Sequence, residues 1–219
     1  MHILQDYDLI EHVLQAFQDT YLNIDSCPTM SKKQAINLLP LGTEELLDAI
    51  YSLSPNQNSK LKQDLTEYSE SYFVVPDKSL NSKRFVRVTY DIDVSFRSMM
   101  VQLKRDTGKS LKILSGYRSP AYQAILLLGG YYSYYYDIET TLKTYMPPGY
   151  SEHGDINKLA IDITTTDTLD HHFDKSECFR WLTANATNYG YFLSYPESQT
   201  EMSFEPWHWH YSDITSRTL

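Results

Sequence analysis

Few cysteines, no long apolar run and no excess of basic charge mark this sequence, and each shortage excludes a class of protein. The chain has 219 residues and only two cysteines, Cys27 and Cys178, which lie far apart. Because they lack CxxC spacing, they cannot form a zinc knuckle by themselves. The alternatives are a single disulfide and two buried thiols, and we expect the buried thiols. Nineteen basic residues face 28 acidic ones, and the net charge of -9 argues against nucleic acid as a partner.

The sequence also lacks a membrane span and a recognisable export signal. No window reaches the roughly 18 apolar residues that a spanning helix needs. The first residues, Met1 to Asp6, carry no basic segment and no long apolar stretch. We therefore expect a cell-envelope or secreted location if a signal precedes this sequence, and a cytoplasmic location otherwise.

The first part of the chain has the hydrophobic spacing of helices. Residues 6–21 carry apolar side chains three and four positions apart, and 31–38 and 43–53 read as two further helices. Thr43 is the expected N-cap of the third helix. A change of character near Tyr72 predicts a helical N-terminal region of unknown role over residues 1–70 and a second domain over residues 71–219.

From Tyr72 onward the pattern mixes strands and helices. Asp91 or Asp93 is the expected cap of a long helix that ends near Thr107, and Gly129-Gly130 is the expected stop of another. This order predicts an α+β fold with a small, mostly antiparallel sheet flanked by helices. The expected strands are 72–75, 85–90, 111–114, 159–163, 191–194 and 208–211, and the expected helices are 91–107, 120–128 and 175–188.

The segment Tyr131 to Tyr136 is the only compositionally unusual one, with five tyrosines in six residues. Tyrosine offers a large stacking surface and a hydroxyl group, so the segment could form an aromatic binding wall. The alternative is an irregular insertion that packs on its own domain, and we favour this second interpretation.

Three stretches together hold what a catalytic zinc site needs. His153, Asp162 and His208 can supply three protein ligands, and a catalytic zinc usually keeps a fourth position for water. Zinc lowers the pKa of that water from about 15.7 to roughly 7. Glu205 lies three residues before His208 and is the candidate general base. Arg118 follows a predicted strand and can hold a carboxylate through two parallel hydrogen bonds.

Spacing alone does not choose between two histidines of the last stretch. On a strand, His208 and His210 face the same side, so either could bind the metal while the other supports it. The flanking Trp207 and Trp209 could exclude water from the site, and they could also pack in the core.

The motifs resemble the zinc D-alanyl-D-alanine carboxypeptidases of the VanY type, within the wider group of lysostaphin-type endopeptidases and hedgehog domains. Ser115-Gly116-Tyr117-Arg118-Ser119 and Glu205-Pro206-Trp207-His208 match that family's motifs. The resemblance covers about 72–211. It implies one zinc per chain, held by His153, Asp162 and His208, with Glu205 as catalytic base. It further implies that Arg118 binds the terminal carboxylate of the substrate, and that Gln123 and Ser151 contact the substrate.

The middle motif departs from the family pattern. His153 and Asp162 are nine residues apart where the family has seven, and Lys158 stands where a glycine is expected. We expect the two extra residues to lie in the loop before the strand, where a change of length costs little.

The resemblance implies an enzyme that removes the C-terminal D-alanine, or a related residue, from peptidoglycan peptides. One alternative is a peptidoglycan endopeptidase of the phage-lysin kind. Another is a hedgehog-like module that binds zinc without catalysis. Glu205 and Arg118 argue against this last alternative, because a purely structural zinc site needs neither side chain.

Overall fold

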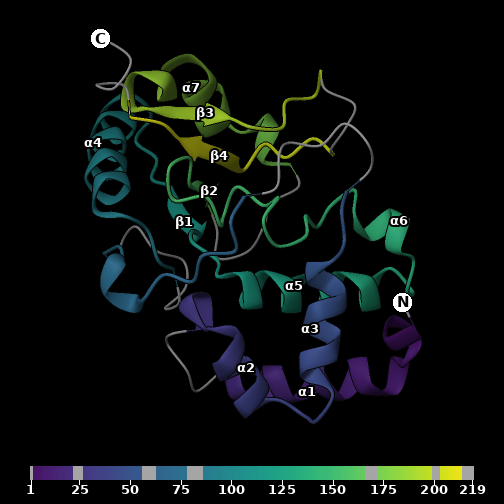
Figure 1. The fold of residues 1–219 in the computed structure, drawn as a ribbon. Helices are drawn as coiled ribbons and strands as arrows, with labels where there is room; N and C mark the ends of the chain where they lie inside the picture. The colour runs from purple at the N-terminus through teal and green to yellow at the C-terminus, as the bar shows by residue number, and fades with distance from the viewer. Residues whose placement is uncertain are drawn as a thin grey trace. The chain divides into compact units, whose positions relative to one another are not determined.

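The computed structural model describes residues 2–21, 27–55, 63–77, 86–165, 172–198 and 203–213. The chain forms two compact units (Figure 1). The first combines Met1–Glu70 with Arg118–Gly154, and the second combines Ser71–Tyr117 with Asp155–Leu219. The expected domain boundary at residue 70 stays a prediction.

The first unit is helical, and α5 runs through its core. Contacts join α5 to α1, α2, α3 and α6 (Figure 1). These helices bury a cluster of aliphatic side chains that includes Ile10, Leu47 and Ile125. The elements of this unit are η1 (His2–Gln5), α1 (Tyr7–Tyr21), η2 (Cys27–Thr29), α2 (Lys32–Leu38), α3 (Thr43–Tyr51), α5 (Pro120–Ser133) and α6 (Ile138–Thr141), and η3 (Glu70–Tyr72) lies at its boundary.

The caps of the early helices show where local chemistry sets a boundary. Ser31 caps α2 in a reciprocal capping box with Gln34, which satisfies two backbone N–H groups. The expected N-cap role of Thr43 is wrong, because Gly42 is the cap of α3. The Thr43 hydroxyl instead donates a hydrogen bond to the Pro40 carbonyl at 2.6 Å.

Helix α5 continues past the pair of glycines that we expected to end it. It runs to Ser133 because Gly129 and Gly130 lie within its regular turns. The second glycine lies against a ring: a Cβ at Gly130 would be 2.4 Å from Cδ2 of Tyr145. These residues therefore allow close packing and do not break the helix.

The tyrosine-rich segment packs on its own unit. Tyr131 is buried, and Tyr136 stacks on Tyr7 with 4.0 Å between ring centroids. The Tyr136 hydroxyl donates a hydrogen bond to Glu11 at 3.0 Å. Burial and this bond raise the pKa of Tyr136 to about 12. The packing interpretation is confirmed for these two residues, whereas Tyr135 remains 93% exposed. The expected irregular insertion is wrong for the first half of the segment, which continues helix α5 to Ser133.

The second unit holds a four-stranded antiparallel sheet of order β1-β2-β4-β3 (Figure 1). The expected α+β class and small antiparallel sheet are confirmed. Its strands are β1 (Lys112–Ser115), β2 (Ala160–Thr164), β3 (Tyr191–Leu193) and β4 (His208–Tyr211), and its helical elements are α4 (Tyr90–Thr107), η4 (Phe173–Lys175), α7 (Glu177–Asn185) and η5 (Ala186–Tyr189).

Two expected strands near residue 80 are wrong for the residues that the structure describes. Val74 and Val88 form a single antiparallel bridge, and Phe85 lies outside the described residues. Helix α4 begins at Tyr90 with Thr89 as its N-cap, so Asp91 and Asp93 lie in its first turn and are not the cap. In the first turn, their negative charges still interact favourably with the positive end of the helix dipole.

Candidate metal centre

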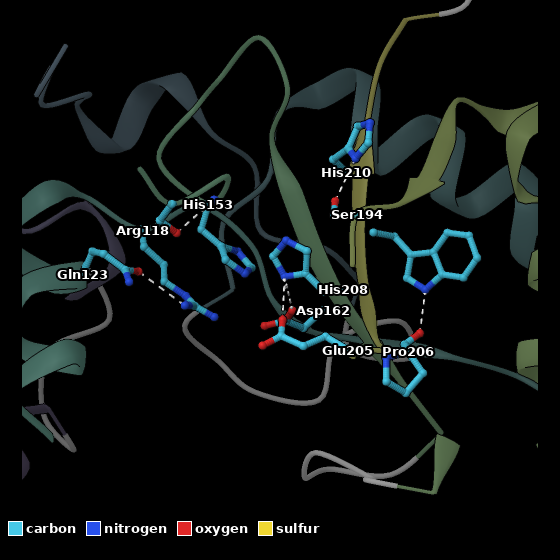
Figure 2. Close-up of polar contacts among 11 residues, drawn as sticks. Arg118, Gln123, His153, Asp162, Ser194, Glu205, Pro206, His208 and His210 are labelled. Carbon is cyan, nitrogen blue, oxygen red and sulfur yellow. Dashed lines mark hydrogen bonds and ion pairs between the residues drawn. The ribbon is translucent and has the colours of Figure 1, made fainter. Parts of the chain in front are cut away.

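Strand pairing brings two of the predicted ligands side by side. Strands β2 and β4 run antiparallel with Asp162 opposite His208. The Nδ1 atom of His208 lies 3.1 Å from Oδ1 of Asp162 (Figure 2). Only 4% of His208 and 5% of Asp162 are exposed to solvent. Burying a carboxylate costs free energy, and buried charges in proteins are therefore paired or bound to a metal.

Glu205 joins this pair through a tight turn. The backbone N–H of His208 donates to the Glu205 carbonyl at 3.1 Å, which closes the turn through Pro206. Oε2 of Glu205 lies 3.7 Å from Nδ1 of His208, and 9% of Glu205 is exposed. The Trp209 indole donates to the Pro206 carbonyl at 2.9 Å, which holds the turn in place.

His210 makes a different set of contacts. Its Nδ1 atom lies 2.8 Å from the Ser194 hydroxyl, and its ring stacks on Phe192 with 5.5 Å between centroids. Tyr195, in contrast, lies beside His208, with 4.8 Å between the ring centroids. The structure therefore brings His208, and not His210, together with Asp162.

His153 lies in a buried loop that backbone hydrogen bonds hold. Its carbonyl accepts a hydrogen bond from the N–H of Arg118 at 2.9 Å (Figure 2). Its own N–H donates to the Ser151 hydroxyl at 3.3 Å. The longer spacing to Asp162 falls in the turn that follows, where the N–H of Lys158 donates to the carbonyl of Asp155 at 3.1 Å before β2 begins. The residues between His153 and β2 thus form turns and no strand, and this is where we expect the two extra residues.

One ligand atom from each of His153, Asp162 and His208 lies within 4.8 Å of the others. All three side chains are buried. Two imidazole nitrogens and one carboxylate oxygen are a donor set that zinc accepts in catalytic sites. Among the residues that the structure describes, this is the one such cluster of three or more.

The Ser-Gly-Tyr-Arg stretch has a steric reason for its glycine. A Cβ at Gly116 would lie 2.2 Å from the carbonyl oxygen of Arg87, so only glycine fits. The same carbonyl accepts a hydrogen bond from the N–H of Tyr117 at 2.7 Å. This close approach fixes the end of β1 and the residue that precedes Arg118.

Arg118, Gln123 and Ser151, the predicted substrate-contacting residues, line one small pocket. Nη1 of Arg118 donates to Oε1 of Gln123 at 3.4 Å, and Nε2 of Gln123 donates to the carbonyl of Met146 at 2.7 Å. Helix α5 positions Gln123 within its first two turns. Gln63, Asp64 and Thr66 line the same pocket, and no motif of the sequence pointed to them.

The cysteines take no part in this cluster. Cys27 and Cys178 are both free and buried, so the expectation of two buried thiols is confirmed. Burial raises the pKa of Cys27 to about 11, which keeps its thiol protonated near neutral pH. None of the described helices is long and apolar enough to cross a membrane.

Residues 87–214 match the family model described as VanY, D-alanyl-D-alanine carboxypeptidase. The chain is 26% identical over 167 residues to a D-alanyl-D-alanine carboxypeptidase of Enterococcus faecium, which covers 74% of this chain and 49% of that relative. The match thus spans about half the length of this relative and of a second one, a putative carboxypeptidase of Bacillus subtilis.

Solved structures show the same fold. The LdcB LD-carboxypeptidase superposes with a TM-score of 0.56 at 25% identity, over 68% of this chain and 72% of the other. A D,D-pentapeptidase VanY variant in complex with Zn(II) has a TM-score of 0.51 at 23% identity, over 73% of this chain and 90% of the other.

Proposed function

Because the chain belongs to the VanY family of D-alanyl-D-alanine carboxypeptidases, we propose that it is a zinc-dependent D,D-carboxypeptidase. It removes the C-terminal D-alanine from peptidoglycan peptides. The observation that carries this proposal is the buried contact of Asp162 with His208, with Glu205 at 3.7 Å from the same imidazole nitrogen. A ligand pair and a separate carboxylate are the parts that a hydrolytic metal site needs.

His153, Asp162 and His208 would hold the zinc. Their donor atoms fit the metal, since zinc takes histidine nitrogen and carboxylate oxygen in catalytic sites. The bound metal supplies a Lewis acid that polarises the scissile carbonyl. The zinc-bound VanY structure supports this assignment by its shared fold.

Glu205 would act as the general base and then as the general acid. Its carboxylate takes a proton from the attacking water and passes it to the nitrogen of the leaving D-alanine. The turn through Pro206 keeps the carboxylate close to His208 without making it one of the three clustered ligands. Because Glu205 is buried, its carboxylate has little contact with bulk solvent.

Arg118 would bind the terminal carboxylate of the substrate, with Gln123 and Ser151 beside it. The guanidinium is oriented by its hydrogen bond to Gln123. A planar guanidinium can form two parallel hydrogen bonds to a carboxylate, and this geometry selects a free chain end.

A direct experiment compares three kinds of peptidoglycan fragment. The zinc-loaded protein is incubated with muropeptides that end in D-Ala-D-Ala, with tetrapeptide forms and with cross-linked forms, and the products are analysed by mass. Loss of a single D-alanine from the first kind alone is the expected result. Cleavage of the cross-linked forms alone would instead identify an endopeptidase.

One structural comparison favours a second candidate, an L,D-carboxypeptidase. The likeness to the LdcB LD-carboxypeptidase covers 68% of this chain. An enzyme of this kind would trim the tetrapeptide forms of the same experiment and leave the D-Ala-D-Ala ends intact.

A further inference from the structure

A cavity of about 720 Å³ lies in the helical unit, and no step of the proposed reaction uses it. Its described lining comes from α1, from α5 and from Tyr145, which follows α6. Volumes of roughly 300–1,000 Å³ are typical of small-molecule sites. The cavity between α1 and α5 is therefore large enough for a ligand of the size of an oligosaccharide fragment.

Two adjacent glycines of α5 keep this space open. Gly129 and Gly130 both line the cavity and place no side chain in it. A Cβ at Gly129 would lie 3.8 Å from Cδ2 of Leu14, which is ordinary contact. Glycine is a poorer helix former than alanine, so the sequence forgoes helix stability at a position where a side chain fits the backbone. The result is an open groove beside α1.

Two tyrosine rings border the cavity in fixed positions. Tyr132 is 47% exposed and packs edge-on against Tyr136, with 5.9 Å between the ring centroids. Tyr136 in turn stacks on Tyr7. The ring of Tyr145 lies against Gly130. An aromatic ring that its neighbours already hold offers a stacking surface at little cost in conformational entropy.

The polar side chains of the lining supply both acceptors and donors. The carboxylates of Asp8 and Glu11 accept hydrogen bonds, whereas the Gln18 amide and the Tyr132 hydroxyl can also donate them. The described lining contains no lysine or arginine, which disfavours an anionic ligand. A cation needs acceptors alone. A neutral sugar fits the whole set, because its hydroxyl groups donate and accept while its C–H faces stack on aromatic rings.

We propose that this cavity binds the glycan part of the peptidoglycan substrate, and the identity of the sugar rests on the proposed function. Gln123, which bonds to Arg118, lies on α5 seven residues before Gly130, or about 10 Å along the helix axis. A peptide of five residues spans up to about 17 Å when it is extended. One peptide can therefore cover this separation, and the cavity holds the sugar that carries it.

Calorimetric titration of the full chain with tetra-N-acetylglucosamine, a neutral oligosaccharide, tests the site without hydrolysis. We expect binding that Gly129→Leu abolishes, because the leucine side chain enters the cavity while it favours the helix. Tyr132→Ala should weaken binding by roughly two- to tenfold, the effect of one aromatic contact. Circular dichroism checks that both variants keep their helices.

Tyr90→Ala is the matched control. Tyr90 is a tyrosine of α4 that is 67% exposed and belongs to the other unit. Its replacement should leave sugar binding unchanged. Absence of binding to the wild-type chain, or equal binding to the folded Gly129→Leu variant, would overturn the glycan site. Tighter binding of tetralysine than of the sugar would identify a cationic ligand and overturn it as well.

Kinetics distinguish the failure of this site from the failure of the proposed reaction. D-alanine release is measured for a free pentapeptide that ends in D-Ala-D-Ala and for the same peptide attached to its glycan. In Gly129→Leu, KM for the glycan-attached substrate should rise roughly tenfold, the effect of lost fit in a pocket, while kcat and both constants for the free peptide stay unchanged.

The two proposals can fail separately. Sugar binding that Gly129→Leu abolishes, without D-alanine release from either substrate, would keep the glycan site and overturn the proposed function. D-alanine release with the same KM for both substrates, in the wild-type chain and in the variant, would overturn the glycan site and leave the proposed function intact.

Discussion

His208 and His210 lie two residues apart, yet the structure gives them different environments. The first lies 3.1 Å from Asp162, and the second bonds to Ser194. We expect His208→Ala to lose most bound zinc and His210→Ala to keep it. Metal content after dialysis, measured by atomic emission, checks this difference. The reverse order of metal loss would move the ligand role to His210.

Glu205 should separate catalysis from metal binding. Because it is a base and not one of the three clustered donors, Glu205→Gln should lower kcat by roughly 10²- to 10⁴-fold while zinc stays near one per chain. Zinc content and D-alanine release, measured on the same preparation, test both halves of the prediction. Loss of zinc along with activity would show that the carboxylate acts as a ligand.

The same residues show how far the sequence can predict a site. The motifs, together with the family that they resemble, predicted His153, Asp162 and His208 as ligands, and the structure places a donor atom of each within 4.8 Å of the others. Spacing alone could not separate His208 from His210, because that choice depends on a cross-strand neighbour and on Ser194. Distant neighbours of this kind are invisible to a reading of local periodicity.

At the scale of elements, the sequence predicted existence and type better than boundaries. Strand β4 has the expected bounds, and α1 begins one residue later than expected. Helix α5 is longer than predicted and includes Gly130, a residue type that often ends helices. Here the glycine allows close packing against the Tyr145 ring, a tertiary contact that local sequence does not show. The expected strand at 72–75 reduced to one bridge at Val74, since no neighbouring strand pairs with it among the described residues.

The end of α5 also carries a correctable local strain. Tyr135 has a φ of 53° in the left-handed region, and its side chain is 93% exposed. Asparagine tolerates this conformation better than tyrosine, and little packing is lost at an exposed site. We expect Tyr135→Asn to raise the free energy of unfolding by roughly 0.5–1 kcal/mol. Urea denaturation measures this change.

Tyr132→Asn is the control for that substitution. Tyr132 lies inside α5 and packs edge-on against the Tyr136 ring, with 5.9 Å between centroids. The same change of residue type should therefore lower stability here. Equal effects at both positions would mean that backbone strain at Tyr135 contributes nothing measurable.

At the scale of the whole molecule, the helical unit joins two distant parts of the chain. The buried face of α5 packs against α1 and α3, which both lie within the first 51 residues. Arg118 and His153 belong to the same unit as these helices. The N-terminal region is therefore part of the framework that holds proposed site residues, and it is more than an appendage of the match that begins at residue 87.

Deletion of residues 1–70 tests this view and the expected domain boundary together. The truncated chain would expose the apolar face of α5, which includes Ala124, Ile125 and Leu128. Each large aliphatic side chain that loses its cover forfeits roughly 1.5–3 kcal/mol, so a few of them equal the whole stability of a typical domain. We expect an insoluble or dye-binding product without activity. A soluble truncated chain that still releases D-alanine would show that the second part folds alone, because no helix of the deleted region would then be needed to hold α5 in place.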